Sequence, residues 1–153
     1  MEKLHLISAD TLFYQPLDHP KMLIDGILSN GLAILSGDSK IGKSWMVLWL
    51  CLKISRGEPV WGLPTAKTDV IYLALEDNDW RIQQRMQDLV DIPPDNLQFG
   101  FSCGKLGAEL EGQIKAVLED NPNTGLLFID TLQMVRDNVS SRVNAYAQDY
   151  KDL

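Results

Sequence analysis

One short stretch of the sequence combines residue types that together bind phosphate. It consists of Gly37, Asp38, Ser39, Lys40, Ile41, Gly42, Lys43 and Ser44. The two glycines permit backbone dihedrals that bring successive N–H groups close to an anion. At this spacing Lys43 would reach the β- and γ-phosphates of a nucleotide, and the Ser44 hydroxyl would bind Mg²⁺. The stretch therefore predicts a P-loop, and we expect these eight residues and Trp45 to line a nucleotide site.

The segments on either side of this loop are those that a P-loop requires. Residues 32–36 form an apolar run of strand length, and residues 45–52 form an apolar run of helix length. The helix should end near Arg56 and Gly57, with Pro59 just beyond. Its N-terminus would add dipole and N–H groups to the phosphate site. The alternative is an ordinary glycine-rich turn between a strand and a helix.

Acidic residues follow two other apolar runs, at residues 70–75 and 126–129. In an open parallel sheet, ligands bind beyond the carboxyl ends of the strands, where these side chains would lie. Asp130 fits a Walker B aspartate, which holds Mg²⁺ directly or through water. Glu76 is the candidate for polarising the attacking water, and Asp77 is its rival. The alternative is that residues 76–79 only cap a helix.

Further side chains near these strand ends have less specific interpretations. Thr131 would contact the γ-phosphate region or simply form a turn at the end of the strand. Arg81, Arg85 and Arg136 are candidates for stabilising transition-state charge. For each arginine, a solvated position at the surface is the favoured interpretation.

The order of the predicted elements indicates an α/β fold with a mostly parallel sheet. Strands are expected at residues 32–36, 70–75, 97–101 and 126–129, with helices between them. All these strands except 97–101 lack polar alternation, so they should be covered on both faces and have neighbours on both sides. We expect residues 1–22 to form an N-terminal segment and residues 23–153 to form the ATPase core.

Composition limits the classes of partner. The chain has 153 residues, the size of one domain, and a formal net charge of −7, which argues against a broad nucleic-acid-binding face. No apolar run is long enough to span a membrane, and the N-terminus lacks the pattern of a signal peptide. Cys51 and Cys103 have no metal-type spacing, so we expect reduced thiols in a cytoplasmic protein.

Several segments together resemble the RepA-type branch of RecA-like ATPases. They are residues 36–45, 56–59, 72–77, 129–132 and the Asn-x-Tyr-x-x-Asp-Tyr pattern at 144–150. The resemblance implies a RecA-like sheet between helices, Mg-ATP hydrolysis at subunit interfaces and a homo-oligomeric ring, hexameric in the family. It also implies translocation on single-stranded DNA, as in plasmid replication. By position, Lys43 and Ser44 match the phosphate and Mg²⁺ residues, Glu76 the catalytic glutamate and Asp130 the Walker B aspartate.

The sequence departs from this family pattern at its end. Family members continue into further core strands, one with a histidine sensor motif, and supply an arginine finger to the neighbouring subunit. This sequence stops at Leu153, so we expect a sheet that lacks the last core strands. For a full-length parent protein, three functions follow in order of preference: a motor ATPase of replication or recombination, a nucleotide-binding module with little turnover, and a small-molecule phosphotransferase. For this chain alone the second function rivals the first, and a regulatory P-loop ATPase that does not act on DNA is a further alternative.

Overall fold

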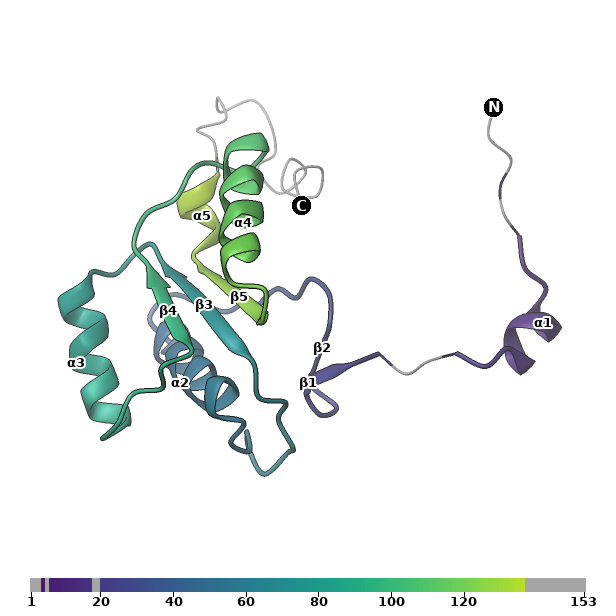
Figure 1. The fold of residues 1–153 in the computed structure, drawn as a ribbon, viewed down its shortest axis with the longest axis horizontal. Helices are drawn as coiled ribbons and strands as arrows, with labels where there is room; N and C mark the ends of the chain where they lie inside the picture. Colours follow the sequence, from purple (N-terminus) through teal and green to yellow (C-terminus); the bar gives the residue numbers. More distant parts are fainter. Residues whose placement is uncertain (1–3, 5, 18–19, 137–153) are drawn as a thin grey trace.

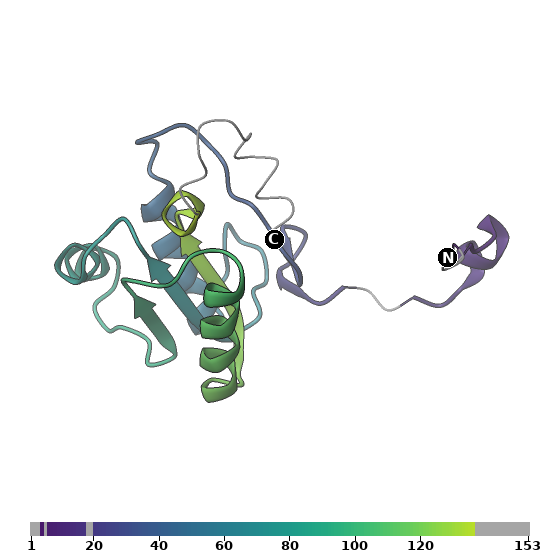
Figure 2. The ribbon, with the colours of Figure 1, turned by 90° about the horizontal axis from the view of Figure 1, so that it is seen from above.

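A three-stranded parallel sheet lies at the centre of the structure, a computed structural model that describes residues 4, 6–17 and 20–136. The strand order is β4-β3-β5, with β3 at Asp69–Ala74, β4 at Leu97–Gly100 and β5 at Thr124–Asp130. The helices around it are α2 (Lys43–Arg56), α3 (Asp79–Leu89), α4 (Ala108–Asp120) and α5 (Leu132–Val135) (Figure 1). Seen from above, α2 and α4 lie on opposite sides of the sheet (Figure 2). The predicted α/β class with a parallel sheet between helices is confirmed.

The first part of the chain forms small elements outside this sheet. Helix α1 (Ala9–Tyr14) is followed by an antiparallel pair, β1 (Met22–Ile24) and β2 (Leu28–Ser29). Gly26 permits the turn between these two strands, because its φ of 68° lies in the left-handed region. Both views place α1 apart from the sheet and its helices (Figures 1 and 2). Accordingly, the side chains of Phe13 and Tyr14 are exposed.

Strand β3 is the central strand, as its near-continuous apolar sequence predicts. Val70 and Tyr72 are fully buried, and Ala74 is almost so. In the register of the sheet, Tyr72 pairs with Phe99 of β4 on one side and with Phe128 of β5 on the other. The three rings pack together, with centroids 5.8 and 6.5 Å from that of Tyr72. Cross-strand aromatic contacts of this kind stabilise the pairing of neighbouring strands.

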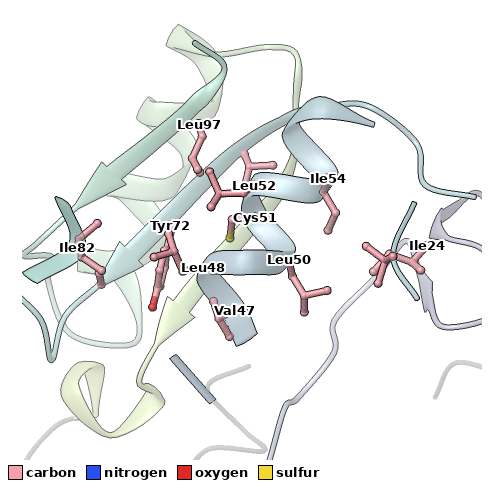
Figure 3. Close-up of a cluster of buried hydrophobic side chains, with 13 residues drawn as sticks. Ile24, Val47, Leu48, Leu50, Cys51, Leu52, Ile54, Tyr72, Ile82 and Leu97 are labelled. Atoms are coloured by element: carbon pink, nitrogen blue, oxygen red, sulfur yellow. The ribbon is translucent and has the colours of Figure 1, made fainter. Parts of the chain in front are cut away.

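Helix α2 supplies most of the core that packs against β3. Its buried residues are Val47, Leu48, Leu50, Cys51, Leu52, Ile54 and Ser55. Figure 3 shows the apolar members of this set together with Tyr72, Ile82 and Leu97 from the sheet and α3. The helix ends where its sequence predicts, because Gly57 adopts a φ of 69° and its N–H bonds the Ile54 carbonyl.

The predicted strand at residues 32–36 is wrong. No strand forms there, and residues 31–40 are all exposed, including Leu32 and Ile34. A strand exists only where a neighbour accepts its backbone hydrogen bonds, and within the described residues the sheet ends at β5. Among the described residues, β5 therefore pairs with a neighbouring strand on one side only. Most of its residues are half-buried, although the sequence predicts a strand that is covered on both faces. The pattern at 144–150 lies outside the described residues.

Candidate active site

Two of the predicted carboxylates meet at the carboxyl edge of the sheet. Glu76 lies two residues beyond the end of β3, and Asp130 is the last residue of β5. The Thr131 hydroxyl donates a hydrogen bond of 2.9 Å to Glu76 Oε1. Next to it, the Leu75 N–H donates to the Asp130 carbonyl at 2.8 Å. The segments that follow β3 and β5 are therefore joined, and the two carboxylates belong to one edge.

A buried tyrosine orients the second of these carboxylates. The Tyr72 hydroxyl donates to Asp130 Oδ2 at 2.8 Å, while the tyrosine residue is fully buried. Burial, followed by the negative charge of Asp130, raises the pKa of Tyr72 well above its ordinary value. The hydroxyl therefore keeps its proton and remains a donor. The sequence alone did not identify Tyr72 as a site residue. One signal was present, because a tyrosine in an otherwise aliphatic buried strand carries a hydroxyl that needs a hydrogen-bond partner.

Asp77, the rival of Glu76, is held in a clamp of two arginines. Arg81 donates to Asp77 Oδ1 at 2.9 Å, and Arg85 pairs with its Oδ2. The side chain of Asp77 is only 7% exposed and that of Arg85 only 16% exposed. The favoured expectation of a solvated surface position is therefore wrong for Arg85. A carboxylate whose two oxygens are both held by guanidinium groups is poorly placed to take a proton from water.

Helix capping in this region belongs to a neighbouring residue. Asn78 is the N-cap of α3, and its side-chain oxygen accepts from the Arg81 N–H at 2.9 Å. Glu76 bonds to Thr131 and not to the first turn of α3. The alternative that residues 76–79 only cap a helix therefore does not explain Glu76.

The P-loop closes around the side chain of its own lysine. Lys43 Nζ donates to the carbonyls of Gly37 and Asp38, at 2.9 and 2.7 Å. Gly42 precedes α2 with a φ of 91°, which the absence of a side chain makes accessible. Ser44 and Trp45 follow in the first turn of the helix. The loop thus has the compact turn into a helix N-terminus that the sequence predicts, without the strand expected before it.

One contact connects the beginning of α2 with the carboxylate edge. The Arg85 guanidinium carbon lies 5.4 Å from the centroid of the Trp45 ring. Arg85 also pairs with Asp77. The structure therefore brings the first turn of α2, which begins at the end of the P-loop, next to the segment that carries Glu76.

An open hollow lies elsewhere on the surface. It has a volume of about 430 Å³ and is lined by Arg56, Glu58, Asp91, Ile92 and Pro93, at the opposite end of α2 from the P-loop. Lys53 and Arg56 both pair with Glu58 beside it, and the Lys53 hydrogen bond is the main reason that the pKa of Glu58 is lowered. None of the predicted site residues line this hollow.

The oxygen donors at the carboxyl edge fit Mg²⁺ in the manner of a nucleotide site. Mg²⁺ prefers oxygen ligands and is usually held by one or two carboxylates together with substrate phosphates and water. Asp130 supplies one carboxylate, and Ser44 supplies a hydroxyl at the start of α2. Within residues 4, 6–17 and 20–136, no group of three or more His, Cys, Asp or Glu side chains is arranged to hold a metal alone.

The parallel α/β sheet, the glycine loop at a helix N-terminus and the two carboxylates at the strand ends are the features of a P-loop ATPase domain. Comparison with protein families gives the same result: residues 2–149 match the AAA domain family, and the chain belongs to it. These are nucleotide-binding ATPase domains, which generally bind ATP with Mg²⁺. Comparisons with curated proteins and with solved structures find no match. Among the described residues, no helix is both long and apolar enough to cross a membrane.

Proposed function

We propose that the chain binds Mg-ATP at the carboxyl edge of the sheet and hydrolyses it to ADP and phosphate. The observation that carries this proposal is the joined pair of strand ends, where Thr131 bonds to Glu76 and Tyr72 bonds to Asp130. A hydrogen bond from a neighbouring hydroxyl orients each of the two carboxylates. Such preorganisation is what an active site for phosphoryl transfer requires, because its catalysis is mostly positioning and electrostatics.

Lys43 and the helix N-terminus would bind the phosphates. The Lys43 ammonium now bonds to the carbonyls of Gly37 and Asp38, and it would exchange them for phosphate oxygens, which carry more negative charge. The N–H groups in the first turn of α2 add further donors to the anion. Ser44 and Asp130 are the residues that would hold Mg²⁺, which when bound neutralises charge between the phosphates.

Glu76 is the residue that we assign to the proton transfer. Water would add to the γ-phosphorus while the bond from that phosphorus to the ADP oxygen breaks, and the proton of the water would pass to the Glu76 carboxylate. The hydrogen bond from Thr131 holds one oxygen of Glu76, which favours a single orientation of the other. Asp77 is the weaker candidate, because both of its oxygens pair with arginines.

Within this class we propose a RecA-like motor that acts in DNA replication or recombination as a homo-oligomeric ring. The support is the resemblance of the P-loop, the segment through Glu76 and Asp77, and the segment after Asp130 to RepA-type ATPases. With a net charge of −7, contact with single-stranded DNA would be confined to a local basic strip. A nucleotide-binding module with little turnover is the second candidate, favoured by the bonds that keep Lys43 within its own loop.

The test compares ATP hydrolysis by the wild type with that of Glu76→Gln. The amide keeps the size of the side chain but does not accept a proton, so turnover should fall by about 10²-fold or more while ATP still binds. Glu58→Gln is the matched control, because it changes a glutamate at the far end of α2 and should leave turnover unchanged. If Asp77→Asn abolishes hydrolysis and Glu76→Gln does not, the assignment is wrong. Tight binding by a wild type without turnover would favour the nucleotide-binding module.

A further inference from the structure

Arg85 contacts two segments that are distant in the sequence. Its guanidinium pairs with Asp77, in the segment that follows β3, and lies 5.4 Å from the Trp45 ring centroid, in the first turn of α2. A separation below about 6 Å is the range of a cation–π interaction. The Arg85 side chain is only 16% exposed, so water competes weakly for its charge. The ion pair with Asp77 is therefore stronger than the same pair at an open surface, whereas the cation–π contact is only partly shielded because Trp45 is 40% exposed.

Each of the two partners of Arg85 is next to a proposed site residue in the sequence, and Trp45 is itself among the residues predicted to line the nucleotide site. Trp45 follows Ser44, and Asp77 follows Glu76. Arg81 holds the other oxygen of Asp77 at 2.9 Å, so Asp77 has little freedom to leave its position. A displacement of the Asp77 segment would move Glu76, and a displacement of the Trp45 turn would move Ser44 and the N–H groups of the loop.

We propose that Arg85 is a positioning residue that connects the phosphate-binding turn of α2 to the segment carrying Glu76, through Trp45 and Asp77. This inference rests on the proposed function for its effect on nucleotide, but the connection itself exists without ligand. Arg85 holds the distance between the place where the phosphates bind and the carboxylate that takes the proton. Its role requires both the charge that Asp77 pairs with and the planar group that lies over the ring, and lysine supplies only the charge.

The first experiment measures the connection without nucleotide. The fluorescence of Trp45 is isolated as the difference between a variant and the same variant carrying Trp45→Phe. Arg85→Lys should move this emission to longer wavelength because the ring loses the guanidinium that lies over it. Asp77→Asn should do the same because the guanidinium loses the ion pair that holds it over the ring. Asp79→Asn is the control, because the Asp79 carboxylate accepts a hydrogen bond from the backbone N–H of Trp80 and not from Arg85. This variant should leave the Trp45 signal unchanged. A Trp45 signal that is the same in all three variants would overturn the connection.

The second experiment is a double-mutant cycle on the affinity for Mg-ADP, measured by calorimetry in the full chain. Arg85→Lys should weaken binding by about three- to tenfold, because the phosphate-binding turn is then held less firmly in the binding geometry; one cation–π contact is large enough to account for a loss of this size. Adding Trp45→Phe to Arg85→Lys should weaken binding no further than the more severe single variant, because both changes break one connection. Multiplicative losses in the double variant would show independent roles and overturn the proposal.

The two experiments separate this inference from the proposed function. A wild type that fails to bind Mg-ADP refutes the proposed function, while the Trp45 signal still decides whether Arg85 joins the two segments. If the wild type binds Mg-ADP normally and the affinity losses of the two single variants multiply in the double variant, only the positioning role of Arg85 is refuted. Arg85→Met is a more severe variant for the same tests, and Arg85→Lys keeps them informative if the methionine variant does not fold.

Discussion

Removal of the Tyr72 hydroxyl should cost the protein measurable stability without creating a cavity. A phenylalanine at this position keeps the ring that packs between Phe99 and Phe128, so the fully buried site stays filled. What is lost is the 2.8 Å hydrogen bond to Asp130. A hydrogen bond to a charged group contributes roughly 1.5–3 kcal/mol, and the lower end applies because Asp130 is only half-buried and water can replace part of the bond. We expect Tyr72→Phe to lower the free energy of unfolding by about 1.5 kcal/mol at pH 7.

The stability difference between the wild type and Tyr72→Phe should also depend on pH. Burial raises the pKa of Tyr72 above its ordinary value of 10.0, so the unfolded chain loses the phenolic proton first as pH rises. Above about pH 10 the unfolded state therefore binds fewer protons than the native state, and wild-type stability falls by up to about 1.4 kcal/mol per pH unit from this group. The Tyr72→Phe variant has no phenolic proton at this position, so the stability gap between the two proteins should close as pH rises from about 10 to about 11.

Urea denaturation at pH 7, 10 and 11 measures both effects. Tyr14→Phe is the matched control, because Tyr14 is exposed on α1 and the change should leave stability within about 0.5 kcal/mol. A Tyr72→Phe protein as stable as the wild type at pH 7 would refute the role of this hydrogen bond. A gap that widens above pH 10 would refute the reasoning about the pKa.

Two further predictions concern thiols and association. Cys51 is buried in α2, and burial raises the pKa of its thiol. A thiol reagent should therefore modify Cys103 in the native protein and Cys51 only after unfolding. Equal rates of modification at the two cysteines would contradict the burial of Cys51. Leu32 and Ile34 are exposed apolar side chains, and the β5 edge of the sheet is unpaired within the described residues. Light scattering should therefore detect self-association, and a Leu32→Glu/Ile34→Glu variant should weaken it. A wild type that scatters as a monomer at all concentrations would contradict the second prediction.

The sequence was sufficient to predict elements whose causes are local. Gly57 ends α2 because glycine adopts the left-handed conformation there, and the apolar run from Val70 indicates a central strand covered on both faces. The alternation of strands and helices predicts the parallel sheet. The strand expected at residues 32–36 failed because pairing depends on a neighbour that no local pattern specifies.

The candidate site was predictable only in part, for a similar reason. The P-loop spacing and the carboxylates Glu76 and Asp130 are visible as residue types at strand ends. The choice between Glu76 and Asp77 depends on which side chains surround each of them, and that is a property of the folded chain. One signal was nevertheless present: Arg81 and Arg85 follow Asp77 at intervals of four and eight residues, the spacing of one helix face.

Calorimetric titration of Mg-ATP into the wild type and Lys43→Ala tests most directly that the glycine loop is a nucleotide site. Lys43 is assigned the main electrostatic contact, and loss of its charge-assisted bonds should weaken binding by about ten- to hundredfold. Lys115→Ala removes an exposed lysine on α4 and should bind like the wild type. Clear wild-type binding that Lys43→Ala largely loses is the predicted result. Indistinguishable isotherms for the wild type and Lys43→Ala would contradict the account.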